Sequence, residues 1–243
     1  MGMTARYRWV FFDLFDTLCA VDESVYYEGK RKAAEAAGVE PEAFLQAWRG
    51  TGADASVGRI KHPFERAQRA LETLGIKDRT PVVQVATLDV ETIQECVHFY
   101  DGAPDALSEL KGRGFSLGLI SNATSTTAFV VAPLKLREYL QLLVFSYEVG
   151  STKPDHAIYE AALKRAACPA HEALFVGDGA NRELDAAAAL GMGALCLDHP
   201  VKALTFRNSQ TLSGPQHPKV RAFAELLALP ELQLALRAEV ESS

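Results

Sequence analysis

Near its start the chain reads Trp9-Val10-Phe11-Phe12-Asp13-Leu14-Phe15-Asp16-Thr17-Leu18. The unbroken apolar row at 9–12 is typical of a strand that is buried on both faces of a parallel sheet. Ligands bind to such sheets outside the carboxyl ends of the strands. Asp13, the first carboxylate after this predicted strand, is therefore placed for chemistry.

The same layout recurs further along the chain. An apolar row at 115–120 runs into Ser121 and Asn122, and another at 173–176 runs into Gly177 and Asp178. Between them, Lys153-Pro154 precedes a stretch with helical spacing. Four strand-end or loop positions thus offer Asp, Ser/Asn, Lys and Asp in chain order, and this repetition predicts a site at one edge of a sheet.

These four segments resemble the signature motifs of the haloacid dehalogenase superfamily of hydrolases. The residues that carry the resemblance are Phe12-Asp13-Leu14-Phe15-Asp16-Thr17-Leu18, Ile120-Ser121-Asn122, Lys153-Pro154-Asp155 and Gly177-Asp178-Gly179. One such motif is a weak signal, whereas four in this order and spacing are strong, and they span most of the chain. The resemblance implies an α/β fold with a Rossmann-like three-layer core, a parallel sheet and an inserted α-helical cap domain.

The organisation of the chain agrees with a core and an insertion. Helical spacing without strand-like alternation fills 21–97, and we interpret this block as the α-helical cap domain. Residues 1–20 and 98–243 then form the α/β core domain. In members of the family, the cap closes over the site and chooses the substrate.

Apolar periodicity and turn residues predict the individual elements. Helices are expected in the block at 27–37, 41–48, 63–74 and 90–100, and later at 106–113, 125–134, 155–167, 182–190 and 220–227. Strands are expected at 9–12, 115–120, 142–145, 173–176 and 194–197.

Composition narrows the class of protein. The chain has 243 residues, of which 48% are hydrophobic, and a formal net charge of -6. This acidic balance indicates no general affinity for nucleic acid or for an anionic membrane. No segment approaches the roughly 18 apolar residues that cross a bilayer, so we expect a cytoplasmic protein that acts on a small-molecule substrate. The oligomeric state cannot be predicted from the sequence.

Charge suggests how the motif residues would work. A carboxylate that attacks a phosphoryl group meets a dianion, so cations must neutralise both. Asp13 is the candidate nucleophile, and Lys153 would hold it beside a phosphate oxygen. Mg²⁺ would be bound by Asp13, Asp178 and the main-chain carbonyl of Phe15. The resemblance implies that Glu183, five residues after Asp178, holds a metal-bound water.

Several of these residues have simpler explanations. Ser121 and Asn122 are predicted to donate hydrogen bonds to the phosphate, but Asn122 could instead cap the next helix. Asp178 could be a turn residue, and Glu183 could favour the first turn of a helix through the helix dipole. Lys153 could be an exposed loop lysine.

The chain departs from the family pattern at Phe15. Typical phosphatases of the family have a second aspartate there, which protonates the leaving group. A phenyl ring carries no such proton, so the loss is expected to cost about 100- to 10,000-fold, or about 3 to 5 kcal/mol of barrier, for a poor alkoxide leaving group. We expect the neighbouring Asp16 to bond the turn; its use as a substitute acid is the alternative.

The main prediction is a magnesium-dependent phosphatase that acts through an aspartyl-phosphate intermediate on a small phosphorylated metabolite. An activity like that of the 2-haloacid dehalogenases is an alternative, because they resemble this chain at Phe15, although Asp178 and Glu183 count against it. A phosphonatase-like hydrolase with Lys61 forming a Schiff base is another. A catalytically weakened binding protein is the alternative from a different class.

Three further residues outside the motifs have possible roles. Cys19 could be imagined as a nucleophile, but no basic residue is fixed beside it by the sequence. The four cysteines show no CxxC spacing, which indicates neither a zinc site nor a disulfide framework. Arg49 and Arg59, in the predicted cap, could clamp an anionic substrate, although basic residues on a helical lobe are usually solvated.

Overall fold

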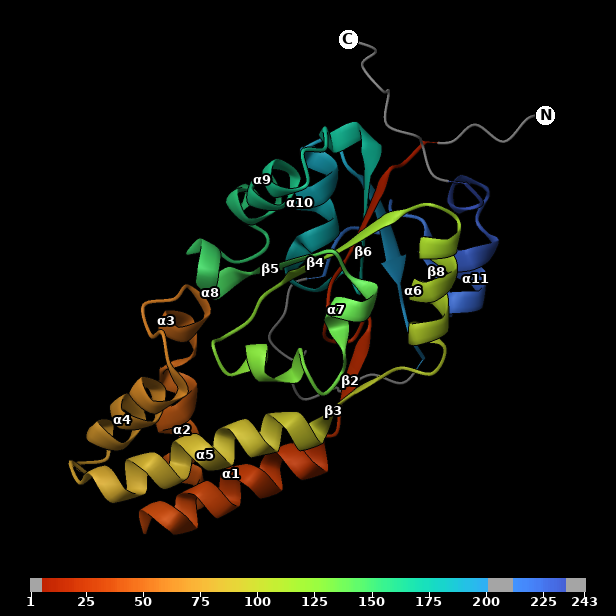
Figure 1. The fold of residues 1–243 in the computed structure, drawn as a ribbon. Helices are drawn as coiled ribbons and strands as arrows, with labels where there is room; N and C mark the ends of the chain where they lie inside the picture. The colour runs from red at the N-terminus through yellow and green to blue at the C-terminus, as the bar shows by residue number, and fades with distance from the viewer. Residues whose placement is uncertain (1–5, 201–211, 235–243) are drawn as a thin grey trace.

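A computed structural model describes residues 6–200 and 212–234 of the chain (Figure 1). Its centre is a parallel six-stranded sheet with the strand order β5-β4-β1-β6-β7-β8. The strands are β1 (Trp9–Phe12), β4 (Ser116–Ser121), β5 (Leu142–Phe145), β6 (Ala173–Gly177), β7 (Gly193–Leu197) and β8 (Lys219–Val220). β1 lies between β4 and β6, so Asp13 follows a central strand.

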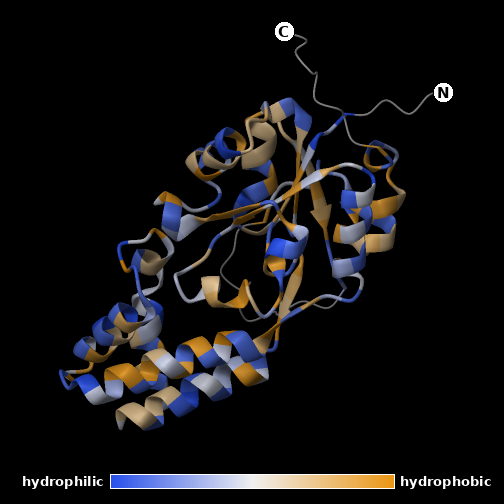
Figure 2. Ribbon diagram, in the orientation of Figure 1, coloured by the Kyte–Doolittle hydropathy of each residue, from blue (hydrophilic) through white to orange (hydrophobic). Residues whose placement is uncertain are grey.

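Both faces of the sheet are covered, which explains the apolar row at 9–12. Val10 and Phe12 belong to one hydrophobic cluster, whereas Phe11 belongs to another on the opposite face, and all three are fully buried. Figure 2 shows the apolar colouring of the central strands. Gly118 on β4 leaves room for the Phe11 ring, because a Cβ atom there would lie 2.6 Å from it. The predicted three-layer α/β core is confirmed.

Helices on each side of the sheet make up the outer layers. One cluster takes side chains from α6 and α11, and the other takes them from α9 and α10. The helices of this part of the chain are α6 (Ala103–Gly112), α7 (Leu136–Tyr139), α8 (Ser146–Val149), α9 (His156–Arg165), α10 (Glu183–Ala189) and α11 (Phe223–Ala228), with short 3-10 turns η1 (Thr127–Val130), η2 (Ala170–Glu172), η3 (Ala180–Arg182) and η4 (Pro230–Leu232).

In this part, one element prediction was wrong in type and another was wrong at its start. The helix expected at 125–134 is only the 3-10 turn η1, followed by turns. Residue 220, expected to begin a helix, instead ends β8, and α11 begins at Phe223. The polar residues 124–127 explain the first error, because Thr and Ser hydroxyls compete for backbone hydrogen bonds: Thr127 Oγ1 accepts one from Thr124 N at 3.2 Å. Part of the chain's tail, at 201–211 and 235–243, lies outside the described residues.

Five helices lie between two short strands and form a lobe beside the sheet (Figure 1). We call residues 22–96 the helical segment. It contains α1 (Glu23–Ala37), α2 (Pro41–Gly50), α3 (Gly52–Ser56), α4 (Pro63–Thr73) and α5 (Arg79–Cys96). An antiparallel pair, β2 (Cys19–Val21) and β3 (Val97–Phe99), joins it to the core. The helix predicted at 90–100 therefore ends at Cys96, and residues 97–99 form a strand instead. The division into domains at residues 20/21 and 97/98 stays a prediction.

The helical segment has a hydrophobic cluster of its own, which includes Phe44, Trp48 and Leu71. α1 and α5 approach closely at Gly29, where a Cβ atom would lie 2.0 Å from Thr92 Oγ1. Among the described residues, no helix has the length and apolar character that crossing a membrane requires.

Candidate active site

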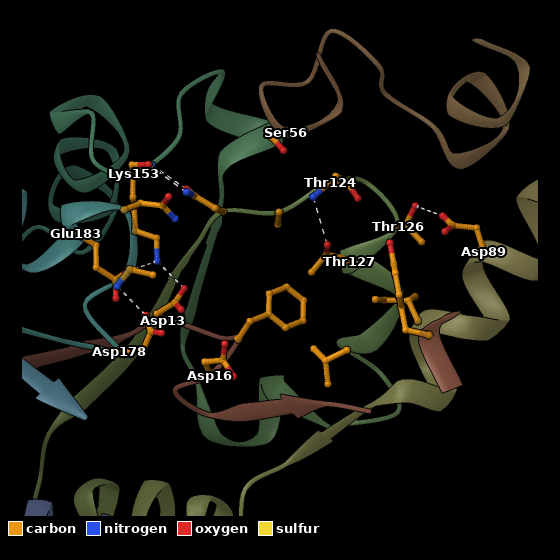
Figure 3. A pocket seen from close by; sticks show the side chains of 18 of the residues that line it. Asp13, Asp16, Ser56, Asp89, Thr124, Thr126, Thr127, Lys153, Asp178 and Glu183 are labelled. Carbon is orange, nitrogen blue, oxygen red and sulfur yellow. Dashed lines mark hydrogen bonds and ion pairs between the residues drawn. The ribbon is translucent and has the colours of Figure 1, made fainter. Parts of the chain in front are cut away.

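The carboxyl ends of three strands and one loop bring the four motifs together. Asp13 follows β1, Asp178 follows β6, and Glu183 begins α10. Lys153 comes from the loop between α8 and α9, and its Nζ lies 2.5 Å from Asp13 Oδ1 and 2.6 Å from Glu183 Oε2 (Figure 3). All four side chains are buried, so Lys153 is not the exposed loop lysine of the alternative explanation.

Burial and charge act against each other in this cluster. Burial raises the pKa of Asp13 to about 7, with the positive charge of Lys153 opposing the rise and Glu183 adding to it. Burial alone would lower the pKa of Lys153, but the carboxylates of Asp13 and Glu183 outweigh it and raise the pKa. Lys153 therefore stays protonated, and its positive charge lies beside the carboxylate of Asp13.

The acidic residues of the cluster suit a hard cation. Ligand atoms of Asp13, Asp178 and Glu183 all lie within 4.8 Å of one another. When ionised, these three buried carboxylates carry three negative charges, and the ammonium of Lys153 pairs with two of them, Asp13 and Glu183. Carboxylate oxygens are the ligands that Mg²⁺ prefers, so the donor set fits a divalent cation.

Glu183 is fixed by a close approach to the end of β6. Its Oε1 accepts a hydrogen bond from Gly179 N at 3.1 Å, and its carbonyl oxygen accepts one from Tyr159 Oη at 2.9 Å. Gly177 makes room for the carboxylate, because a Cβ atom there would lie only 2.1 Å from Glu183 Oε1. The glycine before Asp178 is thus part of the site, and the motif was the only sequence signal for it.

The side chain of Asn122 forms two hydrogen bonds with the backbone of Lys153. Its Oδ1 accepts a hydrogen bond from Lys153 N at 2.7 Å, and its Nδ2 donates one to Lys153 O at 3.1 Å. These contacts position the lysine, and they do not correspond to capping of the next helix. Ser121 is fully buried, with its Oγ 3.4 Å from Asn122 O. The phosphate-donor roles of both residues stay predictions.

A cavity of about 300 Å³ opens beside this cluster, between the core and the helical segment. The core contributes the motif residues and three threonines, Thr124, Thr126 and Thr127. The helical segment contributes Tyr26, Trp48, Ser56, Arg66, Asp89 and Ile93. In Figure 3, Asp89 lies across the cavity from Asp13. These cavity residues of the helical segment could not be predicted from the sequence, because their placement depends on how helices far apart in sequence pack together.

Phe15 and Asp16 both line the cavity. Phe15 is half-buried and packs against the core cluster. Asp16 has a left-handed backbone with φ 57°, and its Oδ1 accepts a hydrogen bond from Tyr100 Oη at 3.2 Å. Phe15 therefore lines the cavity without an ionisable group, while the use of Asp16 as an acid stays a prediction.

Other candidates from the sequence lie away from the cavity. Lys61 is exposed, and neither it nor Arg49 nor Arg59 lines the cavity. Arg59 instead forms an ion pair with Asp54 at 2.9 Å. Cys19 is fully buried, and burial, together with the charge of Asp13, raises the pKa of its thiol, which disfavours a thiolate nucleophile.

Comparison with known proteins agrees with this geometry. The family model for haloacid dehalogenase-like hydrolases matches residues 7–191, which include all four motifs. The chain belongs to the haloacid dehalogenase-like hydrolases. As a member of this family it is a hydrolase.

The curated relatives of the chain include a protein named as a phosphatase and one named only by the family. The chain is similar to a phosphoglycolate phosphatase of Yersinia pseudotuberculosis, with 29% identity over 93% of this chain and 95% of that protein. It is also similar to the human haloacid dehalogenase-like hydrolase domain-containing protein 3, with 28% identity over 82% of this chain and 85% of that protein.

Solved structures with the same fold include an L-2-haloacid dehalogenase from Xanthobacter autotrophicus. That structure covers 93% of this chain and 98% of its own, with 19% identity and a TM-score of 0.62. A HAD family enzyme from Bacteroides thetaiotaomicron covers 79% of this chain and 94% of its own, with 19% identity and a TM-score of 0.63. At these identities, the likeness concerns the fold alone.

Proposed function

We propose that this hydrolase is a magnesium-dependent phosphatase that acts on a small phosphorylated metabolite through an aspartyl-phosphate intermediate. The observation that carries the proposal is the buried cluster in which Lys153 Nζ lies between Asp13 and Glu183, with Asp178 completing an acidic site. A carboxylate nucleophile needs such positive charge around it before it can approach a phosphate dianion.

The reaction has two steps. In the first, an oxygen of Asp13 attacks phosphorus, the bond from phosphorus to the ester oxygen breaks, and the leaving group departs with the bonding electrons. In the second, water attacks the phosphorus of the aspartyl phosphate, which releases inorganic phosphate and restores the carboxylate. Lys153 neutralises charge on Asp13 and on the phosphate in both steps.

Mg²⁺, when bound, would offset the charge of the phosphoryl oxygens. Asp13 and Asp178 would hold it, together with the main-chain carbonyl of Phe15, while Glu183 would orient a water ligand. The carboxylate oxygens within 4.8 Å of one another support this assignment.

Phe15 shapes the choice of leaving group. Its ring cannot protonate a departing alkoxide, so aryl, acyl and anhydride phosphates, whose leaving groups depart as stable anions, should be favoured over alkyl phosphates. A comparison of p-nitrophenyl phosphate with a simple alkyl phosphate tests this preference. Equal kcat/KM values for both would contradict it.

The relatives suggest candidate substrates. Their names include phosphoglycolate phosphatase and glyceraldehyde 3-phosphate phosphatase. Phosphoglycolate and glyceraldehyde 3-phosphate are alkyl phosphates, so they are the first alkyl compounds to assay beside aryl and acyl phosphates. We further propose that the helical segment acts as the cap, since it supplies Trp48, Arg66 and Asp89 to the cavity wall.

The proposal is tested by phosphate release from p-nitrophenyl phosphate and acetyl phosphate, with magnesium and with chelator. We expect activity only with magnesium, and a loss of at least about 1,000-fold in Asp13→Asn, because the amide is not a nucleophile. Chloride release from a haloacid that is unaffected by chelator would instead support dehalogenation. Tight binding of phosphate analogues without turnover would indicate a binding protein.

A further inference from the structure

We propose that Arg66 binds a second anionic group of the substrate, at the end of the molecule away from the scissile phosphate. This inference rests on the proposed phosphatase function and gives its substrate class: phosphate monoesters that also carry a carboxylate or another anion. It concerns a residue outside all four motifs.

Arg66 is held in place but leaves most of its hydrogen-bond donors unused. It lines the cavity and is half-buried. Its Nε donates a hydrogen bond to Thr51 Oγ1 at 2.9 Å, and its guanidinium carbon lies 4.3 Å from the centre of the Trp48 ring. These two contacts fix the plane of the guanidinium and leave the Nη groups available for two parallel hydrogen bonds to an anion.

No acid neutralises Arg66 directly. Among the residues that the structure describes, no carboxylate lies within 4.0 Å of its guanidinium. The neighbouring Asp89 is already engaged, because its Oδ1 is paired with Lys30 and its Oδ2 accepts a hydrogen bond from Thr126 Oγ1 at 2.8 Å. Burial lowers the pKa of Arg66, and the negative charge of Asp89 opposes this change, so an anionic partner would further favour the charged guanidinium.

Charge is distributed unevenly over the cavity wall. Arg66 and Lys153 are the cationic residues among the described lining residues, and Lys153 is occupied by two carboxylates. The group of Lys30, Arg66 and Asp89 carries a net charge of +1 when all three are ionised. Apolar side chains of Phe15, Val21 and Ile93 line the same cavity. A substrate with an anion at each end of a carbon body would match this distribution.

Two aryl phosphates of matched shape test the proposal. They are para-carboxyphenyl phosphate and para-carbamoylphenyl phosphate, which differ in charge at the far end. We expect wild-type enzyme to favour the carboxylate at least about tenfold in kcat/KM, mostly through KM, as for a charge-assisted hydrogen bond. Arg66→Met should bring the ratio close to one, and Arg66→Lys should restore part of it.

Arg69→Met provides the matched control. Arg69 lies on the same helix, is exposed and pairs with Glu65 at 3.0 Å, so its loss should leave the ratio unchanged. A wild-type ratio near one, or an Arg66→Met variant that loses activity equally on both compounds, would overturn the proposal.

A binding measurement separates this proposal from the proposed function. Both phosphates are titrated calorimetrically, in the presence of magnesium, into the Asp13→Asn variant and into a double variant that also carries Arg66→Met. If wild-type enzyme releases no phosphate from either compound, the phosphatase function fails, yet tighter binding of the carboxylate that depends on Arg66 would still support the anion subsite. Equal binding of both compounds would overturn the subsite whatever the turnover.

Discussion

Phe15 is the residue that most distinguishes this chain from the family pattern. It lines the cavity, and it takes the place of the second aspartate that typical phosphatases of the family have. We expect Phe15→Asp to raise kcat/KM on an alkyl phosphate by about 10- to 100-fold, below the full benefit of a general acid because the ring's packing is lost. Phe15→Asn loses the same packing but gains no acidic group, so it should not raise kcat/KM. A rise in both variants would show that the ring merely obstructs the site.

Gly177 sets the position of Glu183. A methyl group at Gly177 would lie 2.1 Å from Glu183 Oε1, so the carboxylate would have to leave Lys153. We expect Gly177→Ala to lower magnesium-dependent phosphate release by at least about tenfold. Gly112→Ala, where nothing lies within 4 Å of the added atom, is the control and should leave activity unchanged. Wild-type activity in Gly177→Ala would mean that the position of Glu183 is unimportant.

At this scale, the motifs predicted the buried cluster but not its surroundings. Asp13, Lys153, Asp178 and Glu183 could be predicted because each follows a strand or stands in a motif of fixed order. Arg66 could not, since it is one of several arginines on the helical segment, and only the packing of α4 against α2 brings it over Trp48.

Among the elements, the helix α10 is linked to the residues before β8 through the carboxylate of Asp185. Asp185 accepts hydrogen bonds from Gly214 N at 3.2 Å and Gln216 Nε2 at 2.9 Å, and its Oδ1 lies 2.7 Å from His217 Nε2. The hydrogen bond with His217, followed by those from Arg182 and Gly214, lowers the pKa of Asp185 to about 2.

Asp185→Asn should therefore lower the free energy of unfolding at neutral pH by about 1 to 3 kcal/mol. Because the folded pKa lies below the ordinary value of 3.8, this stabilisation is present above about pH 4 and is lost as the pH falls towards 2. Urea unfolding of both proteins at pH 7 and near pH 2 measures the difference. A difference that stays constant over this range would contradict the assigned pKa.

Strands with an unbroken apolar row of at least four residues could be predicted, whereas shorter strands could not. The strands at 9–12, 142–145 and 173–176 were expected where β1, β5 and β6 lie. β2 and β3 have only three residues each and β8 has two, which is too few for an alternating pattern to stand out. Their pairing depends on partners distant in the sequence.

For the whole molecule, the fit of the helical segment against the core is the feature that closes the cavity. Ser146 Oγ of the core donates a hydrogen bond to Ser56 O at 2.7 Å. Thr126 Oγ1, also in the core, donates one to Asp89 Oδ2 at 2.8 Å. Gly58 stands at this contact with φ +71°, and a Cβ atom there would lie 2.0 Å from Tyr147 O.

Gly58→Ala should separate the helical segment from the core. We expect kcat/KM to fall by about 10- to 100-fold, since cavity groups on the two sides would shift by an ångström or more. Gly75→Ala is a matched control, because Gly75 has a similar φ of +81° but nothing within 4 Å. Both variants incur similar backbone strain of about 1 to 2 kcal/mol. Equal losses of activity in the two would attribute the effect to strain and not to closure.

The identity of the nucleophile can be measured directly. Protein mixed with acetyl phosphate and magnesium is quenched in acid, digested and examined by mass spectrometry. The account predicts one added phosphoryl group on the peptide that contains Asp13, absent with chelator and absent in Asp13→Asn. Phosphate release that continues in Asp13→Asn, or a phosphoryl group found on another peptide, would contradict it.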